Sequence, residues 1–161
     1  MSKLSDPNLK FTIPWSAIVE SLAFFRQQGQ RDSEGVVLWP AVLDKTTATI
    51  QPIIIPRQIT SRYSFRIPQE ETFRILGELA RTGMVIPIQV HSHPEEAFHS
   101  PADDKLSFVK HAGAISIVVP DFASFADEQF GDVSAFHVLT PRGLWQLVPN
   151  QSVLSRFDFV R

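Results

Sequence analysis

The sequence predicts a single mixed α/β domain in which a curved β-sheet packs against helices. The 161 residues suit one compact domain, here taken as 1–161, and can bury a sizeable core. A hydrophobic fraction of 43% and a charged fraction of 20% are typical of globular proteins. The predicted elements also lack the regular alternation of strand and helix that marks a doubly wound fold.

The first predicted elements follow from apolar periodicity and from the proline and glycine residues that begin and end helices. Apolar side chains recur at helical spacing over 15–28, with Pro14 suited to the first turn and Gly29 ending the pattern. The apolar run 35–39 and the β-branched run 47–55 then predict a hairpin.

A loop and a second helix are expected next. Residues 57–67 show neither helical nor strand period and are predicted to be an extended loop. Pro68 opens the helix, and an acidic pair follows where negative charge favours a helix N-terminus. Phe73, Leu76 and Leu79 are expected to face the core.

The second half is predicted to be mostly strands. The expected elements are a strand at 84–90, a short helix from about 100 to 110, a buried strand at 114–119, a loop at 120–132, and strands at 133–139 and 144–148.

The most informative stretch begins where the strand at 84–90 ends. His91 and His93 are two residues apart, so in a strand both imidazoles project from one face and can reach one metal ion. Pro94 forces the chain to turn, which lets a carboxylate on the following helix return as a third ligand. The chain has no cysteine, so a zinc site here must use histidine nitrogen and carboxylate oxygen. Three protein ligands and one water is the composition of a catalytic zinc site.

These residues resemble the motif of the JAMM (JAB/MPN-type) zinc metalloproteases. That family carries an upstream glutamate, then His-Ser/Thr-His-Pro, then Ser-x-x-Asp. This chain has Glu34, then His91-Ser92-His93-Pro94, then Ser100-Pro101-Ala102-Asp103. The resemblance extends over most of the chain, is greatest to the prokaryotic JAB-domain branch, and implies the MPN/JAB (cytidine-deaminase-like) fold.

The third metal ligand has two candidates. The family's spacing from the second histidine leads to Asp104, whereas its Ser-x-x-Asp relation leads to Asp103. We favour Asp103, because loops absorb deletions more readily than a relation within one helical turn. The remaining carboxylate would then be an exposed charge at a helix N-terminus.

The resemblance implies Zn²⁺ as the cofactor and a role for two further residues. Glu34 would act as general base and Ser100 would donate a hydrogen bond to the oxyanion. Each residue also has a simpler interpretation: Glu34 as an exposed loop carboxylate, and Ser100 as a helix N-cap.

The resemblance also implies a substrate class, namely bonds after the C-terminal glycine of a ubiquitin-like protein or its conjugates. E1-like and E2-like conjugation enzymes are possible partners on the same ground. An extended tail could add as a strand beside 57–67, with Tyr63 and Phe65 as substrate-binding candidates.

Other functions are less consistent with the sequence. A net charge of −2 offers no large surface for nucleic acid, and no apolar run reaches membrane-spanning length, so we expect a cytoplasmic protein. Amidohydrolases with His-x-His use barrels of about 250 residues, which exceed this chain. A non-catalytic MPN-type scaffold remains the alternative to a peptidase.

Overall fold

The computed structural model describes residues 3–98 and 107–161 and consists of a large mixed sheet with helices around it. The strands are β1 (Lys10–Pro14), β2 (Val36–Leu43), β3 (Thr47–Ile50), β4 (Ile59–Ser61), β5 (Ser64–Arg66), β6 (Val85–Ser92), β7 (Ile115–Val119), β8 (Ala135–Leu139), β9 (Trp145–Val148) and β10 (Phe157–Val160). The helices are α1 (Trp15–Gly29), α2 (Gln69–Thr82), α4 (Phe130–Val133) and α5 (Asn150–Leu154), with 3₁₀ turns η1 (Lys3–Ser5), η2 (Asp121–Ala123) and η3 (Asp127–Gln129).

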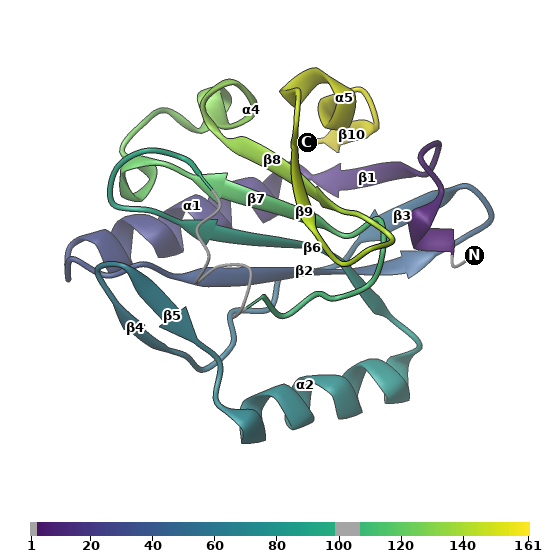
Figure 1. Cartoon of the computed structure of the whole chain (residues 1–161), viewed down its shortest axis with the longest axis horizontal. Coiled ribbons are helices and arrows are strands. Elements are labelled where there is room, and N and C mark those ends of the chain that lie inside the picture. Colours follow the sequence, from purple (N-terminus) through teal and green to yellow (C-terminus); the bar gives the residue numbers. More distant parts are fainter. Residues whose placement is uncertain (1–2, 99–106) are drawn as a thin grey trace.

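Eight strands form the main sheet in the order β10-β1-β3-β2-β6-β7-β8-β9, and β4 and β5 form a separate hairpin (Figure 1). β2 is antiparallel to β3 and β6, whereas β6 is parallel to β7. The predicted mixed α/β class and the hairpin over β2 and β3 are therefore confirmed.

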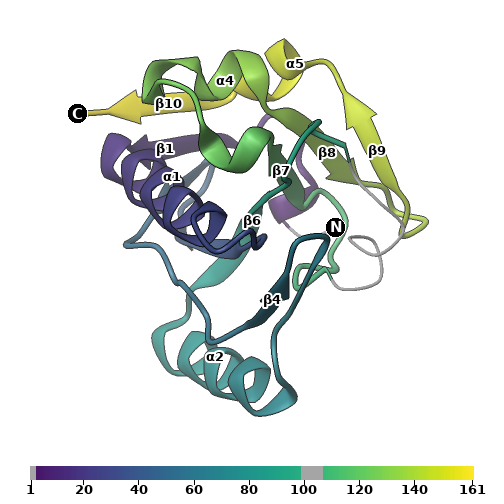
Figure 2. The same ribbon diagram turned by 90° about the vertical axis from the view of Figure 1, so that its left-hand side faces the viewer.

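The central strands are buried on both faces, and α1 and α2 cover opposite faces. Val37 and Trp39 of β2 belong to the core cluster that contains Leu22 of α1. Val36 lies in the second cluster with Ile75 of α2. In both views α2 lies at the lower end of the molecule, away from α1 (Figures 1 and 2). This two-sided burial explains why β2, β6 and β7 read as continuous apolar runs rather than alternating ones.

Trp39 connects α1 to the centre of the sheet. Its fully buried indole donates from Nε1 to Oγ of Ser21 at 3.0 Å, and that hydroxyl donates to the carbonyl of Ala17 at 2.6 Å. A buried indole needs such a partner, because an unsatisfied buried donor costs about 1–3 kcal/mol.

The predicted core face of the second helix is wrong at two positions. Phe73 is 62% exposed and Leu76 is also exposed, whereas Leu79 is partly buried and Ile75 is buried. α2 contacts the body through a narrow stripe that includes Glu71, so apolar spacing alone did not identify the buried face. Gly83 ends the helix in the left-handed conformation, at φ 72°, where glycine has no steric penalty.

Other departures from the sequence-based prediction concern the loops and the chain ends. Residues 57–67 contain the hairpin of β4 and β5 instead of a plain loop. Residues 107–110 are not helical, which contradicts the C-terminal part of the helix predicted from about 100 to 110; the rest of that range lies outside the described residues. β1 and β10 were not expected; they pair in parallel across the length of the chain, a contact that no local pattern encodes. In the described part of the chain, no helix has the length and apolarity needed to cross a membrane.

Candidate metal centre

The pairing of β2 with β6 brings the predicted glutamate to the predicted histidines. Because these strands are antiparallel, the start of β2 lies beside the end of β6. The N–H of Ser92 donates to the carbonyl of Gly35 and the N–H of Gly35 donates to Oγ of Ser92, both at 3.0 Å. As a result Oε1 of Glu34 lies 4.0 Å from Nε2 of His93, and Glu34 is 2% exposed. Glu34 is therefore a buried group of the site and not the exposed loop carboxylate of the simpler interpretation.

The two histidines lie side by side in the interior, as the strand alternation predicts. The ring centroids of His91 and His93 are 5.2 Å apart, and both side chains are buried. The N–H of His93 donates to the carbonyl of Val119 at 2.8 Å, which holds the end of β6 on β7. Aromatic rings pack on both imidazoles: Phe65 lies 5.4 Å from His91, and Phe98 meets His93 edge-on at 4.7 Å.

The donor set suits a borderline metal ion such as zinc. Imidazole nitrogen and carboxylate oxygen are both common zinc ligands. Within residues 3–98 and 107–161, no group of three or more His, Asp or Glu is placed to hold an ion. The described residues thus offer two ligands, His91 and His93, with Glu34 beside them.

Three predicted site residues lie outside the described residues. These are Ser100 and the two candidates for the third ligand, Asp103 and Asp104. Their roles stay predictions.

A cleft of about 180 Å³ opens beside this group. Its lining residues are Glu34, Tyr63, His93, Pro94, Glu95 and Phe98. Tyr63 is 66% exposed at the tip of the β4–β5 hairpin, where a bound chain can reach it. Phe65 is 1% exposed and packs on His91, so its side chain is covered rather than available to a substrate.

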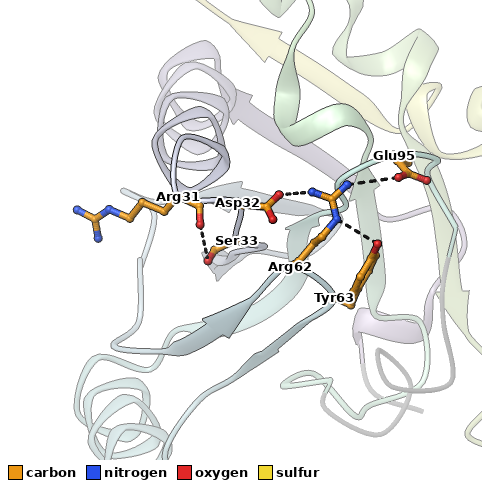
Figure 3. A network of polar contacts seen from close by, with 6 residues as sticks. All are labelled: Arg31, Asp32, Ser33, Arg62, Tyr63 and Glu95. Carbon is orange, nitrogen blue, oxygen red and sulfur yellow. Dashed lines mark hydrogen bonds and ion pairs between the residues drawn. The ribbon is translucent and has the colours of Figure 1, made fainter.

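Arg62 connects the hairpin tip to the segment before β2 and to the segment after β6 (Figure 3). Its guanidinium forms an ion pair with Asp32, just before β2, and a second with Glu95, just after β6, at 3.3 Å. Nε also donates to the hydroxyl of Tyr63 at 3.0 Å. These side chains are well exposed, so each pair contributes little stability, but together they set where the hairpin lies.

Sequence reasoning missed Arg62, Glu95 and Phe98. The hairpin signal was weak because its two-residue turn is Arg62-Tyr63, without the glycine or asparagine typical of tight hairpins. Phe98 has no local feature that separates it from an ordinary loop residue.

The chain has relatives of known classification along nearly its whole length. The model of the family "Prokaryotic homologs of the JAB domain" matches residues 20–130. A protein of Sinorhizobium fredii named "Probable metalloprotease y4jG" is 33% identical over 160 residues, which cover 97% of this chain and 96% of that protein.

A solved structure shares the fold. The solution structure of protein DSY2949 from Desulfitobacterium hafniense superposes with a TM-score of 0.63 over 93% of this chain and 92% of its own, at 16% identity. The range 20–130 that the family model matches includes Glu34, His91 and His93. The chain therefore belongs to the family of prokaryotic homologues of the JAB domain.

Proposed function

We propose that the chain is a zinc-dependent peptidase that cleaves peptide or isopeptide bonds after the C-terminal glycine of a ubiquitin-like modifier. The observation that carries the proposal is the buried group of His91, His93 and Glu34, of which His93 and Glu34 line a cleft. The metalloprotease name of the 33% identical relative supports the same reaction class.

Each residue of the group has a distinct task in this proposal. His91 and His93 hold the ion, with Asp103 or Asp104 as the third ligand. When bound there, zinc would supply an activated water and Lewis-acid polarisation of the scissile carbonyl. Glu34 takes the proton of the attacking water and passes it to the leaving amine. Ser100 donates a hydrogen bond to the developing oxyanion.

The hairpin provides a binding edge for an extended substrate. Among the described strands β5 pairs with β4 alone, so its other edge can accept main-chain hydrogen bonds from a peptide. The cleft is small, at about 180 Å³, and its lining includes the aromatic rings of Phe98 and Tyr63. Small residues such as the Gly-Gly end of a ubiquitin-like tail are the ones that fit such an approach.

The test combines metal content with hydrolysis. Elemental mass spectrometry should find about one zinc per wild-type chain, as a three-ligand site predicts. His93→Ala should lose the ion, and so should whichever of Asp103→Ala and Asp104→Ala removes the third ligand. His111→Gln serves as the matched control, since His111 lies outside the cleft. The wild-type chain should also cleave a ubiquitin-like fusion that carries Gly-Gly before the scissile bond.

Two negative outcomes have different meanings. A wild-type chain without zinc after reconstitution would contradict the peptidase and leave a non-catalytic MPN-type binding module. A zinc-loaded chain that cuts other peptides but no Gly-Gly fusion would contradict only the substrate class.

A further inference from the structure

The turn that follows β7 has an unusual backbone. Asp121, Phe122 and Ala123 are successive non-glycine residues with positive φ, at 53°, 48° and 63°. Side chains of L-residues disfavour this left-handed region, so such a run persists only where the surroundings hold it in place.

This turn holds the segment that carries one of the candidate ligands. The N–H of Phe122 donates to the carbonyl of His93 and the N–H of Asp121 donates to the carbonyl of Glu95, both at 2.9 Å. The left-handed conformation aims these successive N–H groups at the chain just beyond β6. The position of His93 therefore depends on the turn.

One arginine of α1 holds the turn from the other side. Nε of Arg26 donates to the carbonyl of Ala123 at 2.9 Å, and Nη2 donates to the carbonyl of Phe125 at 2.6 Å. The same Nη2 forms an ion pair with Asp127 at 2.7 Å. The planar fork of a guanidinium can satisfy several acceptors at once, which a lysine ammonium on a flexible stem cannot do in the same geometry.

The end of α1 is also shaped to receive the turn. A Cβ added to Gly29 would lie 2.6 Å from Cβ of Phe122, a separation that packed atoms do not tolerate. Glycine at this position lets Phe122 lie directly against the helix.

We propose that Arg26 is a positioning residue for the candidate metal centre, acting through the strained turn at 121–123 on the backbone of His93. Its bond to Ala123 holds the end of the left-handed run, and its bonds to Phe125 and Asp127 hold the segment that follows. The hydrogen bond from Phe122 to His93 then fixes the backbone that carries the His93 imidazole. The inference rests on the proposed function, because it holds that Arg26 and the turn at 121–123 serve to position a ligand of the proposed zinc ion.

The test measures zinc affinity by competition with a chromogenic chelator, using folded protein. Arg26→Met, which removes all three bonds while keeping a long side chain, should weaken zinc binding about tenfold, the low end for groups that orient metal ligands. Arg26→Lys should recover part of the loss. The exposed Arg31, whose side chain points away from the polar network in Figure 3, supplies the control Arg31→Met, which should leave affinity unchanged.

A second readout separates positioning from general stability. Amide hydrogen exchange at Phe122 should accelerate in Arg26→Met, while amides of β2 stay protected. A folded Arg26→Met with wild-type zinc affinity would overturn the inference, even with a lowered melting temperature. If that variant does not fold, Gly29→Ala displaces the turn through Phe122 and must weaken zinc binding for the inference to stand. A wild-type chain that takes up no zinc contradicts the proposed function itself, and with it this inference.

Discussion

Glu34 and His93 come from different strand ends, yet Oε1 and Nε2 of these residues lie 4.0 Å apart in the interior. A carboxylate leaves water only at a cost unless it gains polar or charged partners. Glu34 gains such a partner in His93, whose ring packs against that of His91.

The first prediction is that Glu34→Gln strongly slows hydrolysis but keeps the metal. Glutamine preserves the size of the side chain, but it cannot accept a proton at neutral pH. The turnover rate should fall by about 10²–10⁴-fold, the usual contribution of a general base. Cleavage of a Gly-Gly fusion and zinc content are measured on the same samples. Glu70→Gln in the first turn of α2, where the side chain is exposed, is the control. A rate within about tenfold of wild type would exclude Glu34 as the base.

At the scale of elements, the β4–β5 hairpin has two aromatic residues with opposite surroundings. Tyr63 is exposed at the cleft, whereas Phe65 is buried against His91. The sequence predicts both as substrate-binding candidates, but Tyr63 lies in the turn before β5 and not in the strand, so strand alternation does not place it on the same face as Phe65.

The second prediction separates these two aromatic residues. Tyr63→Ala should raise KM about tenfold with little change in kcat, because it removes an exposed contact to the bound chain. Phe65→Ala should lower the free energy of unfolding by about 3–5 kcal/mol, as expected for loss of a buried ring. Steady-state kinetics and urea denaturation measure the two effects. Unchanged KM and kcat in Tyr63→Ala would remove the hairpin tip from the substrate site.

The start of α2 is attached to the chain before β4 through one buried carboxylate. Glu71 accepts hydrogen bonds from the side chain of Arg74 at 2.5 Å and from the N–H of Arg57 at 2.6 Å. These two hydrogen bonds lower the pKa of Glu71 to about 2, and the bond from Arg74 has the larger effect.

The third prediction follows from that lowered pKa. Because the folded state favours the ionised form, its stabilising effect is present above the ordinary pKa of 4.5 and is lost as pH falls towards 2. At pH 7 Glu71→Gln should lower the free energy of unfolding by about 1.5 kcal/mol, the low end for a charged hydrogen bond with an exposed partner. Urea titrations of both proteins from neutral pH down should show the difference shrinking below the ordinary pKa. A difference independent of pH would contradict the role of the charge.

At the scale of the whole molecule, the candidate metal centre and the turn that supports it join segments that are distant in sequence. Glu34 precedes β2, the histidines end β6, and the 121–123 turn follows β7. An ion held between such segments binds the folded state and not the unfolded chain, so its binding energy adds to the stability of the fold.

The fourth prediction is therefore that zinc stabilises the whole domain. At a free zinc concentration about 100-fold above Kd, the gain is about 2.7 kcal/mol. For a chain of this size that corresponds to a rise in Tm of about 5–10 °C. Thermal unfolding with zinc and with a chelator measures it, and His93→Ala should show no shift. A wild-type Tm that does not respond to zinc would argue against a site formed by the fold.

The sequence by itself determined the class of fold, the central elements and three residues that the fold brings to the candidate metal centre. Local apolar patterns mark the strands β2, β3, β6 and β7 and the helix α1. A motif in the sequence marks Glu34, His91 and His93. The prediction that both histidines lie on one face held for the same reason, since strand alternation is a local property.

Only the tertiary structure decided which surfaces those elements bury and what holds the site together. The exposure of Phe73, the parallel pairing of β1 with β10, and the bonds from Arg26 to the turn all depend on contacts between distant segments. Such contacts leave no periodic signal in the sequence, because the two residues that form each contact have no fixed separation along the chain. Periodicity records the local geometry of a helix or strand, whereas the packing partner of each face is set by how the whole chain folds.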